Sequence, residues 1–233
     1  MNRIDNALSH PLRATAANST NAPLAADVTR VLRNTYGLLA MTLLFSAGVA
    51  GGSASFGLPA PGLVVSLVGM LGLLFLTHKL ANSAWGLLSV FAFTGFMGYT
   101  MGPVIGRTLA IDGGGQIVTM ALASTAVTFL ALSAWVLTTR RDFSFMGGFL
   151  FAGMIVALLA GVGAAFFQIP ALALGVSAMV VLLSAGLILF ETSRIVSGGE
   201  TNYVLATVGL YVSIFNLFSG LLSLLGIGGG GDD

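Results

Sequence analysis

The chain has 233 residues, of which 56% are hydrophobic and only 7% are charged. A water-soluble domain carries about 25% charged residues, so lipid must be the solvent for most of this chain. The net charge of +1 provides no basic surface for nucleic acid, and the lack of cysteine excludes disulfides, thiolate nucleophiles and cysteine metal clusters.

The first 34 residues are polar and include four arginines, at Arg3, Arg13, Arg30 and Arg33. They lack the apolar core of a secretory signal peptide. Their content of Ala, Asn, Ser, Thr and Pro predicts a largely disordered tail over residues 1–34.

Seven apolar runs follow this tail, and each meets or nearly meets the roughly 17–25 residues that a membrane-spanning helix needs. Helices are favoured over barrel strands because the runs are continuous and do not alternate apolar with polar residues. The sequence therefore predicts an all-α polytopic membrane protein, with a bundle over residues 35–226 and a short Gly-rich end over residues 227–233. The predicted spans are 35–56, 60–78, 84–105, 116–138, 145–167, 171–190 and 203–226.

Positive charge is distributed unequally between the two sets of flanks. One set holds the four tail arginines together with Lys79, Arg140, Arg141 and Arg194, whereas the opposite set holds Arg107 alone. Cytoplasmic flanks of membrane helices carry the excess of Lys and Arg, so this distribution predicts a cytoplasmic amino terminus. With seven spans, the Gly-rich end falls on the non-cytoplasmic side.

Glycine pairs inside the spans indicate where helices pack closely. Gly48 and Gly52 are four residues apart, as are Gly98 and Gly102, so each pair lies on one helix face. Small residues let two helix backbones approach, and both pairs therefore predict helix packing.

Two late spans carry polar or small stripes. The sixth has Ser177, Ser184 and Glu191 at seven-residue steps. The stripe of the seventh consists of Gly209, Ser213, Asn216, Gly220 and Ser223. Hydroxyl and amide groups facing lipid would lack partners, so we expect both stripes to face the bundle interior. They fit two interpretations: hydrogen bonds that hold helices together, or the lining of an ion or proton path.

Ionisable groups are scarce in the spans. Glu191 is the one carboxylate at the edge of or inside an apolar run, and Arg194 follows it by three residues. The two fit an interfacial ion pair or a functional site, and the sequence leaves both interpretations open. No run offers a nucleophile beside a base or two histidines one turn apart, so we expect neither an enzyme nor a metal site.

Several segments resemble the signature of the Bax inhibitor family. The matching segments are GLLS at 86–89, GYTMGPVI at 98–105, Ala121, and TAVTF at 125–129. Thr128 departs from the pattern, because the family usually has an aliphatic residue there.

Other segments resemble the bacterial YccA branch of that family. They are VLRNTY at 31–36, TTRRD at 138–142 with Ser144 and Phe145, FETS at 190–193, GGETNY at 198–203, and Leu210, Tyr211 and Asn216. Together, the segments cover nearly the whole chain from about residue 30.

The resemblance implies a bundle in which six helices surround a central seventh, placed in the bacterial inner membrane and without a cofactor. In the YccA branch it implies a modulator, and also a substrate, of the membrane-anchored protease FtsH. That protease engages such partners through their cytoplasmic amino-terminal tail.

Another bacterial branch of the family implies a pH-sensitive calcium leak. There, two aspartates on helices six and seven form a latch, and they correspond here to Glu191 and Ser213. A serine cannot share a proton with Glu191, and one carboxylate alone is a poor calcium site. The resemblance thus favours the FtsH modulator and leaves the calcium leak as the alternative. For an ion path or a pH gate, the candidate residues are Glu191, Ser213, Asn216 and Arg194, with Ca2+ as the transported ion.

Overall fold

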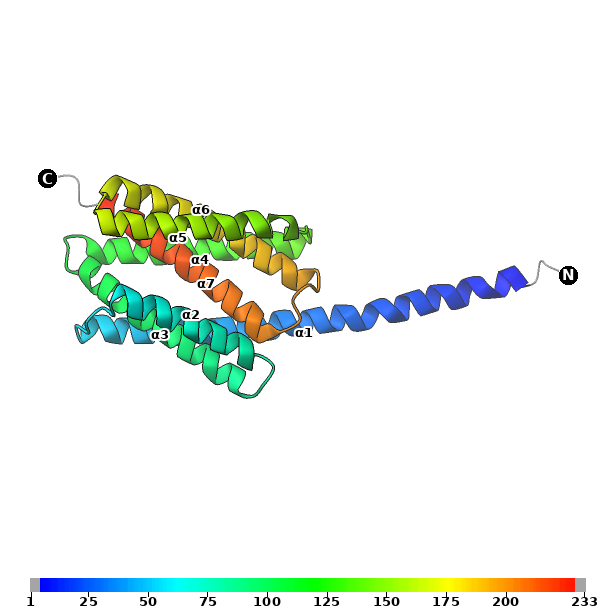
Figure 1. The fold of residues 1–233 in the computed structure, drawn as a ribbon. Helices are drawn as coiled ribbons and strands as arrows, with labels where there is room; N and C mark the ends of the chain where they lie inside the picture. The colour runs from blue at the N-terminus through cyan, green and yellow to red at the C-terminus, as the bar shows by residue number, and fades with distance from the viewer. Residues whose placement is uncertain (1–4, 229–233) are drawn as a thin grey trace.

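The computed structural model describes the backbone of residues 5–228 and the side chains of residues 27–226. Within this part the chain forms seven α-helices and one short 3-10 helix (Figure 1). The elements are α1 (Asp5–Ser55), α2 (Leu63–Leu80), α3 (Trp85–Leu109), α4 (Gly114–Thr139), η1 (Ser144–Met146), α5 (Gly147–Phe167), α6 (Pro170–Val196) and α7 (Tyr203–Gly228). All seven α-helices are long and apolar enough to cross a membrane, α1 over Asp27–Ser55, so the predicted class is confirmed.

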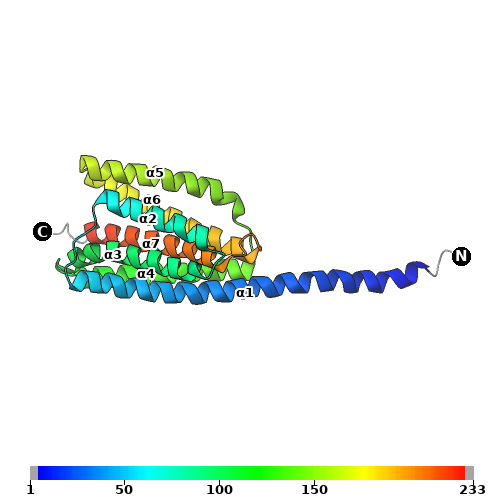
Figure 2. The same ribbon diagram turned by 60° about the horizontal axis from the view of Figure 1, so that its bottom comes forward.

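Helix α7 lies at the centre of the bundle (Figures 1 and 2). It packs against α1, α3, α4 and α6. None of its described side chains, from Tyr203 to Gly226, is exposed. The prediction of a central seventh helix is therefore confirmed, although the other six do not surround it equally.

Helices α2 and α5 lie at the periphery. Helix α2 packs on α3, and α5 packs on α6. Both present large apolar side chains outward: Val64 on α2 is 72% exposed, and Phe151 on α5 is 70% exposed. Such a surface is stable in contact with acyl chains, so these two helices form much of the lipid-facing exterior.

Helix α1 extends well beyond the bundle at its amino-terminal end (Figure 1). Residues 27–34, which the sequence assigns to the tail, belong to the same helix as the first span. The side chains before Asp27 and the residues after 228 lie outside the described residues. The character of the tail and of the Gly-rich end therefore stays a prediction.

Glycine brings α1 and α3 into close contact. A methyl group at Gly98 would collide with the Ser46 carbonyl oxygen, and one at Gly102 would collide with the Ser53 side chain. By contrast, a methyl group at Gly48 or Gly52 would meet nothing within 4 Å. The packing prediction is thus confirmed for the pair on α3 and wrong for the pair on α1.

Pro103 of α3 also depends on the contact between α1 and α3. A proline inside a helix has no N–H, so the carbonyl of Tyr99 one turn earlier loses its normal donor. The Ser53 hydroxyl of α1 donates to that carbonyl at 3.3 Å. The Gly102-Pro103 pair therefore works as a unit, because Gly102 lets α1 approach and α1 then supplies the hydrogen bond that Pro103 removes.

Candidate functional site

The polar stripes of α6 and α7 face each other and form a polar seam between the two helices. The seam consists of Ser177, Ser184 and Glu191 on α6, and Gly209, Ser213, Asn216, Gly220 and Ser223 on α7. At one end, the Ser177 hydroxyl donates to the Ser223 hydroxyl at 2.9 Å. At the other end, the Glu191 carboxyl group packs on Gly209, where an added Cβ would lie 2.8 Å from its carboxyl carbon. The expectation that both stripes face the interior is confirmed.

These two contacts also fix the register of the antiparallel pair. Ser184 lies seven residues from both Ser177 and Glu191, and Asn216 lies seven residues from both Ser223 and Gly209. The register therefore places Ser184 and Asn216 at the same level of the seam. In the described part of the chain, the fully buried Ser184 hydroxyl has no hydrogen-bond partner.

Ser213 is satisfied within its own helix. Its hydroxyl donates to the Gly209 carbonyl oxygen at 2.9 Å, and its side chain is almost completely buried. Among the described residues, no hydrogen bond joins Ser213 to Glu191. Gly209 lies between the two, since it contacts the Glu191 carboxyl group and its carbonyl oxygen accepts the hydrogen bond from the Ser213 hydroxyl.

Arg194 holds two carboxylates at the Glu191 end of the seam. Its guanidinium lies 3.4 Å from a Glu191 oxygen and 3.1 Å from a Glu200 oxygen. The side chains of Glu191 and Glu200 are mostly buried, whereas that of Arg194 is 34% exposed. The guanidinium also stacks over the Phe190 ring, 5.5 Å from its centroid. Arg194 thus forms ion pairs with two carboxylates at the end of α6 while keeping partial contact with solvent.

The turn after α6 places Glu200 beside Arg194. Gly198 adopts a left-handed conformation, with φ of +76°, that residues other than glycine rarely adopt. The Arg194 carbonyl then accepts hydrogen bonds from the backbone N–H groups of Gly199 and Glu200, at 2.8 Å and 3.1 Å. This reversal brings Glu200 back over the last turn of α6.

Asn202 links this turn to the start of α7 and to the α2–α3 connection. Its side-chain oxygen accepts from the N–H groups of Val204 and Leu205, at 2.9 Å and 3.3 Å, and so caps α7. Its amide nitrogen donates to the Ala81 carbonyl at 3.2 Å and to the Asn82 side chain at 2.8 Å. One side chain thus joins the start of α7 to the residues that follow α2.

The α4–η1 connection lies beside the same end of α6. The Phe143 N–H donates to the Ser193 hydroxyl at 3.1 Å. Asp142 accepts two hydrogen bonds from Ser144, through its N–H at 2.8 Å and its hydroxyl at 2.5 Å. These bonds lower the pKa of the exposed Asp142 carboxyl below its ordinary value.

The structure therefore brings together part of the predicted site. Glu191 and Arg194 form the expected pair, with Ser213 one turn of α7 beyond Gly209 and Asn216 further along. The prediction missed Glu200 and Asn202, although both stand in the GGETNY segment at 198–203. The described residues contain no cluster of three or more metal-binding side chains. The arrangement can hold α6, α7 and the α2–α3 connection in one geometry, and it places a carboxylate at the end of a polar seam.

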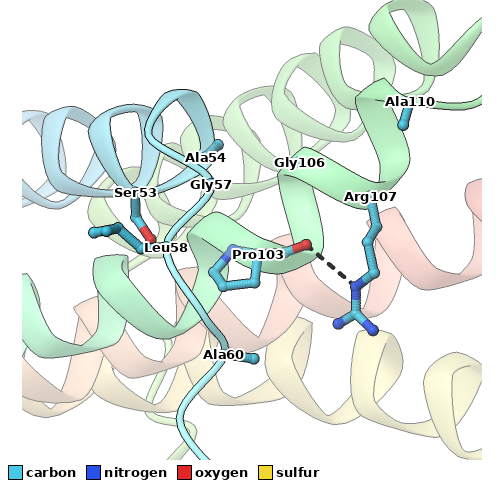
Figure 3. A pocket seen from close by; sticks show the side chains of 9 residues that line it. All are labelled: Ser53, Ala54, Gly57, Leu58, Ala60, Pro103, Gly106, Arg107 and Ala110. Atoms are coloured by element: carbon cyan, nitrogen blue, oxygen red, sulfur yellow. Dashed lines mark hydrogen bonds between the residues drawn. The ribbon is translucent and has the colours of Figure 1, made fainter.

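Arg107 borders a separate cavity of about 460 Å³ at the carboxyl ends of α1 and α3 (Figure 3). Its Nε donates to the Pro103 carbonyl at 3.2 Å, and the side chain is exposed. Gly57 and Ala60, from the connection after α1, line the other side of this cavity. An exposed cation at a helix end is typical of a residue that reaches the lipid headgroups.

Comparison with known proteins gives the family. The sequence model of the family described as "Inhibitor of apoptosis-promoting Bax1" matches residues 28–230. The chain is 55% identical over 197 residues to "Modulator of FtsH protease YccA" of Escherichia coli K12, covering 84% of this chain and 90% of that protein. It has the same identity and coverage with "Inner membrane protein YccA" of Escherichia coli O6:H1. A membrane protein of Vibrio cholerae is 43% identical over 202 residues, covering 86% of this chain and 91% of that protein.

The range matched by the family model spans the helices from residue 28 of α1 to the end of α7, including the Gly102-Pro103 pair, the polar seam and the turn that carries Glu200 and Asn202. The chain is a multi-pass membrane protein that belongs to the Bax inhibitor family.

Proposed function

We propose that this protein modulates an FtsH-type membrane protease, and is also a substrate of it, in the bacterial inner membrane. The observation that carries the proposal is the 55% identity over 84% of the chain to a relative named as a modulator of FtsH protease. A second relative with the same identity is named as an inner membrane protein. The proposed role is regulatory and not catalytic. It needs no cofactor and no nucleic acid, and its partners are the lipid bilayer and the protease.

The amino-terminal segment is the proposed handle for the protease. Helix α1 extends past the bundle, so residues ahead of Asp27 precede the first membrane span. The excess of Lys and Arg on the flanks that share a side with this segment supports a cytoplasmic amino terminus and an outer carboxyl terminus. A segment so placed is within reach of a protease whose working parts face the cytoplasm.

The proposal is tested by co-purification with FtsH from membranes, with and without residues 2–26. We expect the intact chain to retain FtsH and the deletion to lose most of it. FtsH can engage the tail through its sequence or only through its length. A variant in which a Gly/Ser linker of equal length replaces residues 2–26 distinguishes these two modes. Loss with the linker indicates that FtsH reads the sequence, and retention indicates that it needs only a flexible length of chain. Unchanged retention of FtsH by the deletion variant would contradict tail-mediated engagement.

Modulation itself requires a kinetic measurement. In proteoliposomes that contain FtsH and one of its membrane-protein substrates, adding the intact chain should slow substrate degradation, and the deletion variant should slow it less. Degradation of the substrate at the same rate with and without the intact chain would exclude the modulator role.

A passive cation leak is the second candidate function, with Ca2+ as the transported ion. The placement of Glu191 on Gly209, at the end of the polar seam, favours it. Ser213 counts against it, because a hydroxyl bound to the Gly209 carbonyl provides no second carboxylate for a latch. In this proposal Glu191 is the titrating gate, Arg194 is its counter-ion, and Ser213 and Asn216 border the path.

Calcium flux into liposomes that contain the purified protein tests the leak. The leak predicts flux that changes with pH over roughly pH 5–8 and that responds to Glu191→Gln. Absence of flux, or flux that is the same in the Glu191→Gln variant, would exclude the leak as stated.

A further inference from the structure

A cavity of about 530 Å³ lies among α1, α3, α4 and α7. Most of its lining is aliphatic or aromatic, including Leu44 of α1, Leu130 of α4, and Phe215 and Phe218 of α7. It is separate from the polar seam, because it lies against α1, α3 and α4, whereas the seam lies between α6 and α7. Neither candidate function uses it.

The cavity opens sideways toward lipid between α1 and α4. These two helices do not pack closely against each other, whereas each packs against α7. Leu44 is 76% exposed and Leu130 is 63% exposed, and these two lining residues stand on the two sides of the opening. In a membrane, their exposed faces contact the acyl chains of the bilayer, and the cavity is continuous with that lipid-facing surface.

The polar side chains in the lining direct their hydroxyl groups into the protein. The Tyr211 hydroxyl lies 2.6 Å from that of Ser46 and donates to the Thr94 carbonyl at 3.2 Å. Thr125 donates to the Ala121 carbonyl at 2.7 Å. Each of these three lining hydroxyls therefore has a protein partner. The wall of the cavity is thus apolar and suits an aliphatic ligand, whereas an ion or a polar ligand would find few groups to bind it.

We propose that this cavity binds one acyl chain of a bilayer lipid. Its volume lies within the roughly 300–1,000 Å³ of small-molecule sites, whereas a further transmembrane helix, about 10–12 Å across, would fill that volume with roughly one turn. An empty cavity in hydrocarbon forfeits dispersion contacts along its walls. A flexible chain entering from the bilayer restores those contacts without leaving a polar group unpaired.

Helix α7 provides a sensitive reporter, because no described side chain on it is exposed. Phe215 and Phe218 line the cavity, so a lipid tail that enters it lies against them. The probe is a phospholipid with a diazirine in the middle of one acyl chain, included in phosphatidylethanolamine/phosphatidylglycerol vesicles that contain the full chain. After illumination, mass spectrometry locates the label at residue level, with Leu159 on the lipid-facing surface of α5 as the internal reference.

Two glycines of α1 give a matched pair of variants. A Cβ added at Gly51 or Gly48 meets nothing within 4 Å, but only Gly51 lines the cavity. Gly51→Phe should fill the cavity and reduce labelling of Phe215 and Phe218 several-fold relative to Leu159. Gly48→Phe adds the same ring elsewhere on α1 and should leave that labelling unchanged.

Ala126→Phe repeats the filling test from the α4 wall, in case Gly51→Phe disturbs the fold. Melting temperatures close to that of the natural chain establish that each variant is folded. Absence of label on α7 in the natural chain would overturn the proposal. Label on α7 that both folded filling variants leave unchanged would overturn it as well.

Discussion

At the residue scale, the contact between α1 and α3 depends on a few atoms. Gly98 admits the Ser46 carbonyl, Gly102 admits the Ser53 side chain, and Ser53 in turn satisfies the Tyr99 carbonyl. In lipid there is little hydrophobic force between helices, so close packing and such hydrogen bonds supply the stabilisation. Changes of a single methyl or hydroxyl group should therefore be measurable.

We expect Gly98→Ala to destabilise the protein by about 1–3 kcal/mol, because the new methyl group must push α1 and α3 apart. Gly48→Ala is the matched control, since it adds the same methyl group to open space. Its gain in helix propensity, at most about 1 kcal/mol, should make it neutral or slightly stabilising. Unfolding in detergent measures both, and equal effects of the two variants would contradict the packing described for α3.

Ser53 and Pro103 should be energetically coupled. Ser53→Ala removes the donor to the Tyr99 carbonyl and should cost about 0.5–2 kcal/mol. Pro103→Ala restores an N–H that can bond to the same carbonyl. In the Pro103→Ala variant, Ser53→Ala should therefore lower the free energy of unfolding by less than it does in the natural chain. A double-mutant cycle on the free energies of unfolding checks this, and strictly additive effects would show that Ser53 does not substitute for the missing N–H.

At this scale the sequence predicts neighbours on one helix better than partners on another. The Glu191–Arg194 pair follows from three-residue spacing within α6. Glu200 joins them through a turn that depends on the left-handed Gly198, and Gly209 meets Glu191 only through the packing of α7 on α6. The glycine pairs show the same limit, because spacing defines a helix face but not what lies opposite.

At the scale of elements, the junction of α6 and α7 is held by side chains that satisfy helix ends. Arg194 is near the carboxyl end of α6, where a cation complements the helix dipole. Asn202 caps the amino end of α7 and also reaches the α2–α3 connection. The two helices of the polar seam are therefore joined at one end by a polar network and not by loop length alone.

The two functions of Asn202 can be separated by substitution. Asn202→Asp keeps the oxygen that caps α7 and loses the two hydrogen bonds donated to Ala81 and Asn82. Asn202→Ala loses the cap as well, which adds about 0.5–2 kcal/mol. We therefore expect stability to fall in the order Asn, Asp, Ala. Thermal unfolding in detergent measures the series, and an Asp variant less stable than the Ala variant would contradict it.

The apolar runs predict the existence of all seven helices but not their ends. Hydropathy marks where a chain meets hydrocarbon, whereas backbone hydrogen bonding continues into water wherever the residues permit a helix. Helix α6 accordingly continues from the predicted residue 190 to Val196, which places Glu191 and Arg194 inside it. Helix α1 likewise begins before the first apolar run.

At the scale of the whole molecule, seven crossings place the two ends of the bundle on opposite sides of the membrane. The flanks that share a side with the amino-terminal segment carry eight cations, against Arg107 on the other side. Because this asymmetry sets orientation during insertion, we expect the amino terminus in the cytoplasm.

Reporter fusions check this orientation. Alkaline phosphatase joined after residue 233 should be active, because that enzyme matures only outside the cytoplasm, and a fluorescent protein fused at the same point through the same secretory route should stay dark. Fusions at Ser197, after six crossings, should give the reverse pattern. The same reporter activity at both fusion points would mean that α7 does not cross the membrane.

The helix at the centre of the bundle is the seventh to leave the ribosome. While the nascent chain is being inserted, the six helices before it reach the bilayer without the element that four of them pack around or against in the finished fold. Until α7 arrives, the hydroxyls of Ser177 and Ser184 and the carboxylate of Glu191 have no opposing helix. A chain whose translation stops before Tyr203 therefore leaves this polar face of α6 uncovered, a chemical mark by which cellular quality control can distinguish an unfinished copy from a complete one.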